Sequence, residues 1–252
     1  MKFSKFMSVI IAACALLSAC NEKKDGSGKT LTVGVSADYA PFEYFKDGKI
    51  VGFDIDLMTE IAKRLNKDVN FKDMSFDAIL GSLTTQRLDA AVSSIEATDE
   101  RRKSIDFSKE YIKSERVLVC QSTSSIASFT DLAGNSVGVQ SGSTHETYAK
   151  GTLNNDVNVT VKSLAKIPDL LQDMENGNVT CLILGTTEAE AIKTSRANIK
   201  VINLPSEVSG AAVAFPKGSP LKAAVDKVLD EMEADGSLKK LKEKWLPHDV
   251  AF

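Results

Sequence analysis

Hydrophobic positions in the first half of the chain switch between the period of a strand and the period of a helix. Residues 31–35 alternate and are rich in β-branched side chains, which predicts a strand. Apolar residues then recur at helical spacing over 53–65, and a strand at 69–71 and a helix at about 76–83 follow. Two short apolar runs, 88–92 and 116–120, predict buried strands.

The same rhythm restarts in the second half. We expect strands at 136–140, 157–161, 179–184, 201–204 and 211–215, and helices from 144 to about 150, at 164–176 and over 221–245, where Gly236 separates two of them. Alternating strands and helices indicate α/β sheets covered on both faces. Two such units in series predict two lobes with a cleft between them, where small ligands bind.

The first twenty residues are typical of an export signal. Lys2 and Lys5 precede an apolar run over 6–17, which would form about 18 Å of helix, shorter than a bilayer core of roughly 30 Å. The sequence LSAC at 17–20 resembles the lipobox of bacterial lipoproteins. The resemblance implies a signal peptide over 1–19, cleavage before Cys20, diacylation of its thiol and a flexible tether over 20–29. The alternative is an ordinary signal peptide with an incidental cysteine.

Composition excludes several classes of protein. The chain has 252 residues, of which 43% are hydrophobic and 26% charged, as in ordinary globular proteins. Cleavage before Cys20 leaves 233 residues with 29 basic and 34 acidic side chains, so we expect no nucleic-acid partner. His145 and His248 lie far apart and the four cysteines show no paired short spacing, so we expect no metal and no other cofactor. We expect His145 on the surface of a helix.

Seven motifs occur in order along the mature chain. They are ADYAPFEY (37–44), VGFDIDL (51–57), FDAILGSL (76–83), LDAAVSS (88–94), TDERRKSIDFS (98–108), VGVQSGST (137–144) and DGSLKKLKEKW (235–245). Together they resemble the polar amino-acid-binding proteins of bacterial ABC importers, and arginine-binding members in particular. These are two-lobed periplasmic binding proteins.

The resemblance implies a type II periplasmic-binding-protein fold, with two mixed sheets flanked by helices and a two-strand hinge. Lobe 1 would comprise 30–114 and 206–252, and lobe 2 would comprise 115–205. The lobes would close around one amino acid, and the loaded protein, a monomer, would dock on the membrane permease of an ABC importer. Acylated Cys20 would hold it on the outer side of a bacterial membrane.

The resemblance also assigns the ligand's carboxylate and ammonium. Arg101 in the TDER motif matches the arginine that binds the carboxylate, a task suited to a bidentate guanidinium. Thr144 would add a backbone amide at a helix start. Ser94, beside Ser93, matches the position whose backbone carbonyl accepts from the ammonium. The alternative for Arg101 is a surface arginine beside Arg102 and Lys103. The alternative for Ser94 is a serine at a strand end with no role in binding.

The ligand's side chain would lie between two aromatic walls. Tyr39 and Phe76 match those walls, where a planar side chain gains stacking and cation–π attraction; the alternative is that both rings are core residues. The amide of Gln140 would form a hydrogen bond with a polar group at the end of the ligand's side chain. Ser36 stands where members that bind cationic amino acids often carry an acid, and Asp38 would replace that acid only if it turns inward. Because two aromatic walls favour a planar, extended side chain, we rank arginine ahead of lysine, glutamine and histidine.

One departure from the family concerns the ammonium. Relatives commonly carry an aspartate after the strand that here ends at Leu184, whereas this chain has Gly185. Glu96, in turn, stands where relatives show serine or threonine. We predict that the counter-charge has moved from lobe 2 to Glu96 in lobe 1. The alternative is that Glu96 faces solvent and that Glu188 or a nearby group compensates.

The sequence therefore predicts a binding protein without catalysis. An enzyme on the same scaffold, of the cyclohexadienyl or arogenate dehydratase type, is one alternative, with Glu96 as its general acid. A sensor domain of a signalling receptor is another. In the family topology, the strand ending at Cys120 runs antiparallel beside the strand containing Cys181, and the sequence leaves open whether the two form a disulfide.

Overall fold

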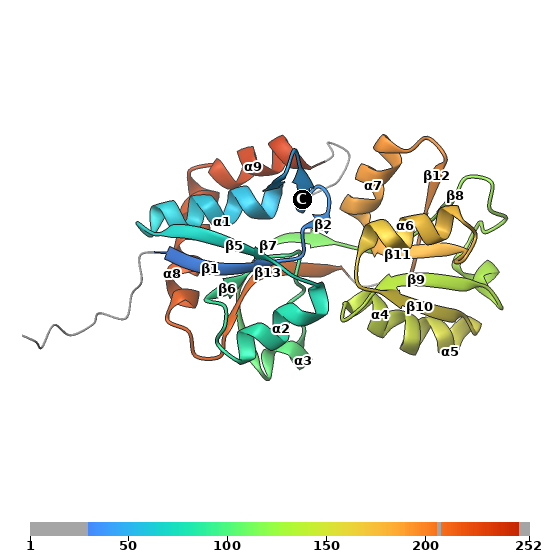
Figure 1. Ribbon diagram of the computed structural model, residues 1–252, viewed down its shortest axis with the longest axis horizontal. Coiled ribbons are helices and arrows are strands. Elements are labelled where there is room, and N and C mark those ends of the chain that lie inside the picture. Colours follow the sequence, from blue (N-terminus) through green and yellow to red (C-terminus); the bar gives the residue numbers. More distant parts are fainter. Residues whose placement is uncertain (1–29, 206–207, 247–252) are drawn as a thin grey trace, which may run out of the picture.

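The computed structural model describes residues 30–205 and 208–246, which form two α/β lobes lying side by side (Figure 1). The signal peptide, the tether and Cys20 lie outside the described residues. Each lobe is built around its own five-stranded sheet.

The sheet of lobe 1 has the order β5-β1-β6-β13-β7. Its strands are β1 (Thr30–Val35), β5 (Asp68–Asp73), β6 (Ala90–Ala91), β7 (Ile105–Ser114) and β13 (Ser209–Pro216). The first three pair in parallel, and β13 pairs antiparallel with β6 and β7. This mixed sheet brings a strand from near the end of the chain into the centre of the lobe.

Helices cover both faces of this sheet. The helices α1 (Phe53–Arg64), α8 (Leu221–Ala234) and α9 (Ser237–Trp245) pack on one face. On the other face lies α2 (Phe76–Thr84), with the short α3 (Asp99–Arg102) beside it (Figure 1). A small antiparallel sheet of β2 (Asp38–Tyr39), β3 (Glu43–Lys46) and β4 (Lys49–Val51) precedes α1.

The sheet of lobe 2 has the order β10-β9-β11-β8-β12. Its strands are β8 (Arg116–Gln121), β9 (Ser136–Gln140), β10 (Thr160–Leu164), β11 (Cys181–Gly185) and β12 (Ile199–Asn203). The helices α6 (Ile167–Glu175) and α7 (Thr186–Ser195) cover one face. The other face carries a 3-10 turn (Phe129–Leu132), α4 (Thr144–Tyr148), a π-helical turn (Ala149–Leu153) and α5 (Asn154–Val157).

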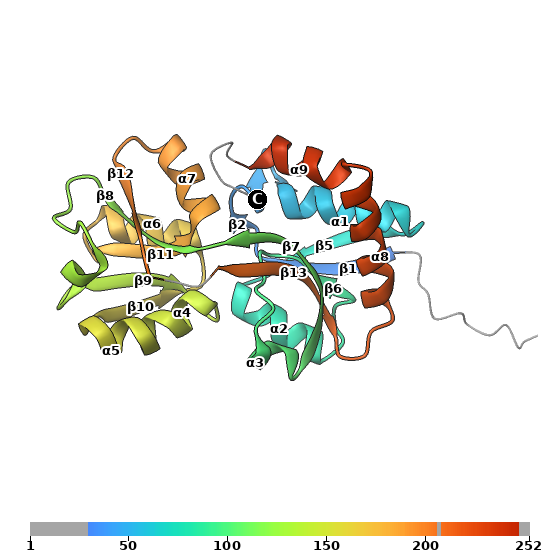
Figure 2. The ribbon, with the colours of Figure 1, turned by 180° about the vertical axis from the view of Figure 1, so that it is seen from behind.

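The chain crosses between the lobes twice. It leaves lobe 1 where β7 ends and β8 begins, at Glu115, and it returns between Asn203 and Ser209 (Figure 2). Because the described chain passes between the two sheets at these two places, the ends of several elements of both lobes border the space between them.

Several element boundaries differ from those predicted. The strand expected at 157–161 begins at Thr160, because Asn158 has a φ of 54° and ends α5 in a left-handed conformation. The helix expected from 164 begins at Ile167, with Pro168 in its first turn. Cys120 and Cys181 face each other in the antiparallel β8–β11 pair and are joined by a disulfide, which the sequence left open.

Candidate functional site

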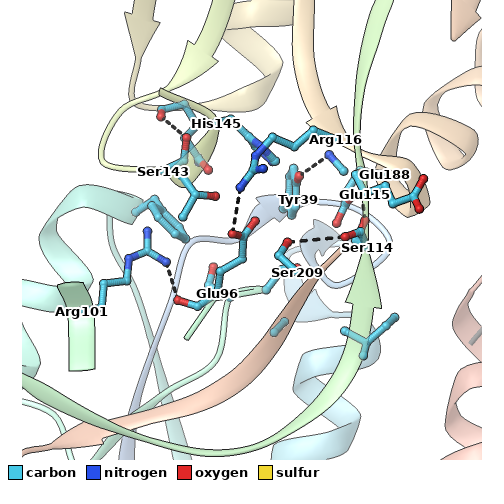
Figure 3. Close-up of a pocket in the computed structure, with 18 residues that line it drawn as sticks. Tyr39, Glu96, Arg101, Ser114, Glu115, Arg116, Ser143, His145, Glu188 and Ser209 are labelled. Carbon is cyan, nitrogen blue, oxygen red and sulfur yellow. Dashed lines mark hydrogen bonds and ion pairs between the residues drawn. The ribbon is translucent and has the colours of Figure 1, made fainter. Parts of the chain in front are cut away.

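A polar cavity lies between the lobes, beside the crossing segments (Figure 3). Lobe 1 lines it with Tyr39, Phe76, Ser93, Ser94, Glu96 and Arg101, and lobe 2 with Gln140, Thr144, His145, Gly185 and Glu188, among others. Of the ten residues proposed from the sequence for ligand binding, Ser36 is the one that does not line this cavity. Ser36 is buried behind its wall, where its backbone N–H donates to Ser93 Oγ at 3.1 Å.

Arg101 is held with its guanidinium at the mouth between the lobes. It is the third residue of the four-residue helix α3, and the Thr98 side chain accepts from its backbone N–H. Its Nη1 donates to the Glu96 carbonyl at 2.9 Å, and its Nη2 donates to the Gly142 carbonyl of lobe 2 at 3.1 Å. Two of its five N–H donors are used in this way within the described part of the chain, which leaves others for an anion in the cavity.

Two aromatic rings border the cavity, and both also have structural contacts. Phe76 opens α2 and lies 5.7 Å from the Arg101 guanidinium, measured to the ring centroid. The Tyr39 hydroxyl accepts from the Gly185 backbone N–H at 3.3 Å, so this ring reaches from lobe 1 to lobe 2. Phe76 is also buried in a core cluster of lobe 1, and Tyr39 packs against core clusters of both lobes, so the two rings line the cavity and belong to the cores as well.

A buried acidic network supports the floor of the site. The Ser94 backbone N–H donates to Asp54 at 2.8 Å, and the Tyr111 hydroxyl donates to the same Asp54 oxygen at 2.9 Å. Ser93 Oγ donates to Glu43 at 2.8 Å. Burial raises the pKa of Asp54 to about 6, and burial followed by the charge of Asp54 raises the pKa of Glu43 well above its usual range. These bonds fix the strand end at Ser93 and Ser94, where φ of Ser94 is 47°.

Glu96 faces the cavity, not solvent. Its side chain is 15% exposed, and Oε2 lies 3.3 Å from Nη2 of Arg116, whose side chain is 16% exposed (Figure 3). Arg116 begins β8 in lobe 2 and also lies over the Tyr148 ring, 5.4 Å from its centroid. Arg116 was not predicted as a site residue, because a single arginine before an apolar strand does not indicate a contact with the other lobe.

Gly185 ends β11, and Glu188 lies one helical turn further, in the first turn of α7. Glu188 is 2% exposed. Burial raises its pKa to about 8, against hydrogen bonds from its own backbone N–H and from Tyr39. The cavity therefore has a buried carboxyl group that is protonated at neutral pH.

His145 was predicted on a helix surface, and that prediction is wrong. It lies in the first turn of α4 and lines the cavity, because Ser143 caps that helix with its first turn toward lobe 1. Burial lowers the pKa of His145 to about 4; the charge of Glu96 raises it, and the charges of Arg116 and Arg101 lower it further. A neutral imidazole therefore contributes to the cavity wall.

The lobes also touch each other outside the cavity. Asp38 does not line the cavity: Gln140 Nε2 of lobe 2 donates to its Oδ1 at 3.4 Å, and Lys166 Nζ of lobe 2 lies 3.6 Å from its Oδ2. Gly142 has a φ of 77°, and a Cβ there would lie 2.9 Å from the Asp77 Cα of lobe 1. These contacts join lobe 1 to lobe 2 and describe a closed arrangement.

Across 30–205 and 208–246, no cluster of three or more histidine, cysteine or acidic side chains has the arrangement of a metal site. Within the same ranges, none of the helices has the length and apolar character needed to cross a membrane.

Two lobes joined by two crossing segments, with a polar cavity between them, define a two-lobed solute-binding protein. The chain belongs to the bacterial extracellular solute-binding proteins, family 3, whose model matches residues 31–248. The resemblance stated from the seven motifs and the fold class that it implied are both confirmed.

Three similar proteins carry information about function. The arginine-binding extracellular protein ArtP of Bacillus subtilis (strain 168) is 35% identical, over 96% of this chain and 97% of that protein. An ancestral arginine-binding protein bound to arginine has a TM-score of 0.82 and 35% identity, covering 86% of this chain and 98% of that one. The ancestral amino acid-binding protein AncCDT-1, a precursor of cyclohexadienyl dehydratase, has a TM-score of 0.80 and 31% identity, covering 87% and 96%.

Proposed function

We propose that this protein is an extracellular receptor that binds a polar L-amino acid, arginine before lysine, glutamine or histidine, and delivers it to an ABC permease. The observation that carries the proposal is Arg101, a guanidinium fixed by two carbonyls at the junction of the lobes, with N–H donors to spare. A free carboxylate is the anion that such a planar cation binds in a bidentate manner. The neighbouring Thr144 borders the same space.

The remaining predicted residues have complementary roles in this proposal. Tyr39 and Phe76 border the path of a planar side chain, and a guanidinium between aromatic rings gains about 0.5–2 kcal/mol from cation–π attraction. Gln140 offers an amide, and Ser94 a backbone carbonyl. Glu96 provides negative charge from lobe 1 for the ammonium. Arginine is ranked first because its side chain is extended and ends in a planar guanidinium. The names of two similar proteins, ArtP and the ancestral protein, also describe them as arginine-binding.

Closure of the lobes is the proposed means of capture. The contacts of Tyr39 with Gly185 and of Arg101 with Gly142 form only when the lobes meet, and the side chains of Tyr39 and Arg101 line the cavity. A ligand that bridges the lobes would stabilise this arrangement through its differential affinity for the closed state. We place the lobe boundaries at 30–114 with 206–252, and at 115–205, and propose that the receptor acts as a monomer.

We also propose that the protein is exported and lipid-anchored. The support is in the sequence: two lysines, an apolar run too short for a bilayer span, and LSAC at 17–20. Acylated Cys20 would hold the folded lobes at the membrane through the tether over 20–29, close to the permease.

The first experiment is identification of the ligand that the protein retains. Native mass spectrometry of protein purified without added amino acids, followed by denaturation and analysis of the released small molecules, should find one polar amino acid, arginine first. Cocrystals with it should place its carboxylate on Arg101. A released ligand without an amino-acid head group would contradict the proposal.

A second candidate function has one specific observation in its favour. Glu188 is a buried carboxyl with a pKa of about 8 in a cavity with two arginines, and a general acid for dehydration of a dicarboxylate would need such a group. The similarity to a precursor of cyclohexadienyl dehydratase points the same way. This acid is Glu188 and not Glu96, which the sequence analysis had suggested. Incubation with prephenate and arogenate, followed by mass spectrometry, tests this function: turnover would favour the enzyme.

A further inference from the structure

Gly185 and Glu188 share one small volume in the cavity wall. A Cβ built on Gly185 would lie 2.3 Å from Glu188 Oε2 and 2.9 Å from Ser114 Oγ. Both distances are shorter than real Cβ contacts allow, so the carboxylate occupies the space that a side chain at 185 would need. The absence of a side chain at 185 is what lets Glu188 reach the cavity.

The Glu188 carboxyl also has unused hydrogen-bonding capacity. The residue is 2% exposed, and its Oε2 has no hydrogen-bond partner among the described residues. A buried polar oxygen without a partner is costly unless a ligand supplies a donor. Figure 3 shows Glu188 beside Tyr39 and Ser114 at the side of the cavity away from Arg101.

The other acids that line the cavity are placed differently. Glu96 already has a cation, because its carboxylate lies 3.3 Å from Nη2 of Arg116. Glu115 is exposed at the crossing segment. Glu188 alone among the three combines burial with an unpartnered oxygen.

We propose that Glu188 is the main acceptor for the ammonium group of the bound amino acid, seated in the cavity by the missing side chain of Gly185. The inference rests on the proposed function and deepens it. The charges support it: Arg101 pairs with the ligand's carboxylate, Arg116 pairs with Glu96, and the ammonium and Glu188 remain as the third pair. Glu96 then contributes negative charge from the opposite lobe.

Titration of Glu188 follows from its surroundings. Tyr39, Asp54, Glu96 and Tyr111 interact electrostatically with Glu188, and the other charged or titratable groups that line the cavity are Arg101, Glu115, Arg116 and His145. Because burial holds the pKa near 8, the carboxyl is protonated in the empty cavity at neutral pH, and binding of an ammonium must expel that proton. Amino-acid affinity should therefore rise with pH, by up to about tenfold per unit below pH 8.

The test compares a ligand with and without its ammonium. The probes are L-arginine and 5-guanidinopentanoate, which lacks the α-amino group, titrated calorimetrically between about pH 6 and 8. Wild-type protein should bind L-arginine more tightly as pH rises and release about one proton, while affinity for 5-guanidinopentanoate should not rise. Glu188→Gln should weaken L-arginine about 10- to 100-fold at pH 8, the range for a hydrogen bond to a charged group, and remove its pH dependence.

A matched control is available on the same helix. Glu190, two residues along α7, pairs with Lys193 and does not line the cavity, so Glu190→Gln should leave both affinities unchanged. If wild-type protein binds L-arginine and Glu188→Gln binds it equally well with the same pH dependence, the inference is wrong and the proposed function stands. If wild-type protein binds none of the twenty amino acids, both are wrong.

A rescue experiment tests the geometry independently, including the case in which Glu188→Gln does not fold. Gly185→Asp alone should weaken L-arginine, because its Cβ collides with Glu188. Glu188→Ala should weaken it by removing the acid. The double variant Gly185→Asp, Glu188→Ala should bind L-arginine at least tenfold more tightly than Glu188→Ala alone, because removal of the Glu188 carboxyl makes room for the acidic side chain introduced at position 185. Binding no tighter than in Glu188→Ala would contradict the inference.

Discussion

Arg116 of lobe 2 and Glu96 of lobe 1 form an ion pair across the cleft, with Nη2 3.3 Å from Oε2. Both side chains are about 15% exposed, so water screens this pair less than a surface pair. The pair places a negative charge inside the cavity and ties that charge to closure of the lobes. Its position explains why a glutamate is tolerated in the cleft.

The role of Glu96 can be measured by one conservative substitution. We expect Glu96→Gln to weaken amino-acid binding by about 1.5–3 kcal/mol, because the cavity loses negative charge near the ammonium and the ion pair with Arg116 is lost. Arg116→Gln and the double variant complete a cycle in which the two changes are strongly non-additive. A loss below about 0.5 kcal/mol for Glu96→Gln, with additive effects, would show that this carboxylate has no part in binding.

The disulfide ties together the two central antiparallel strands of lobe 2. Cys120 and Cys181 are 61 residues apart, and closing a loop of that length restricts the unfolded chain by about 4 kcal/mol in the loop-entropy model. We expect the Cys120→Ala, Cys181→Ala double variant to lose stability of that order in urea unfolding, and reductant to bring wild-type protein to the same value. Alkylation of both thiols in denatured, unreduced protein would refute the disulfide.

Stability of the ligand-free protein should depend on pH through its buried acids. Burial raises the pKa of Glu188 to about 8 and of Asp54 to about 6, above the unfolded value of about 4. The folded state therefore binds more protons, and the stabilisation is complete below the unfolded pKa and is lost as pH rises through the folded pKa.

Because the pKa of His145 is lowered to about 4, its contribution has the opposite sign below about pH 6.5, so we expect the free energy of unfolding to fall most clearly between about pH 6.5 and 8, by up to about 1.4 kcal/mol per unit. Glu188→Gln should flatten the part above about pH 6. Urea titrations at several pH values provide the measurement, and stability that rises across this interval would contradict the account.

Helices and strands with a regular spacing of apolar residues were predicted from the sequence, and those with an irregular spacing were not. The helix α1 was found because its apolar residues repeat at helical spacing on one buried face. The strand β7 was not predicted, because shifts in its register with β13 break the alternation, and buried residues then occur in pairs such as Tyr111 and Ile112. The helix α7 (Thr186–Ser195) was not predicted, because its first turn buries polar residues, Thr187 and Glu188, and its apolar face is weakly marked.

Site residues that belong to contiguous motifs could be predicted from the sequence, and those that depend on contact between the lobes could not. Arg101, Phe76 and Tyr39 belong to contiguous motifs, and the structure brings them to one cavity. Arg116 and His145 line the same cavity only because lobe 2 meets lobe 1, and no local pattern encodes that meeting. Asp54 lies in the first turn of α1, where it is fully buried and accepts from Ser94 and Tyr111, and no local pattern in the sequence indicates that burial.

Anchoring is tested at Cys20. Because the acyl chains would be attached to its thiol, Cys20→Ser should yield a protein that is exported but recovered in the aqueous phase of a detergent phase separation, whereas wild-type protein enters the detergent phase. A variant that still enters the detergent phase would disprove the lipoprotein assignment.

The most direct measurement of the central claim is calorimetric titration of wild-type protein and Arg101→Ala with each of the twenty L-amino acids. Wild-type protein should bind a polar amino acid, arginine most tightly, and Arg101→Ala should bind it at least 100-fold more weakly with an unchanged far-UV spectrum. The magnitude follows because a charge pair shielded from water loses one partner, at about 3–5 kcal/mol. Arg102→Ala, a change to the exposed neighbouring arginine, should bind like wild type. Near-wild-type binding by Arg101→Ala, or no binding of any amino acid by wild-type protein, would contradict the account.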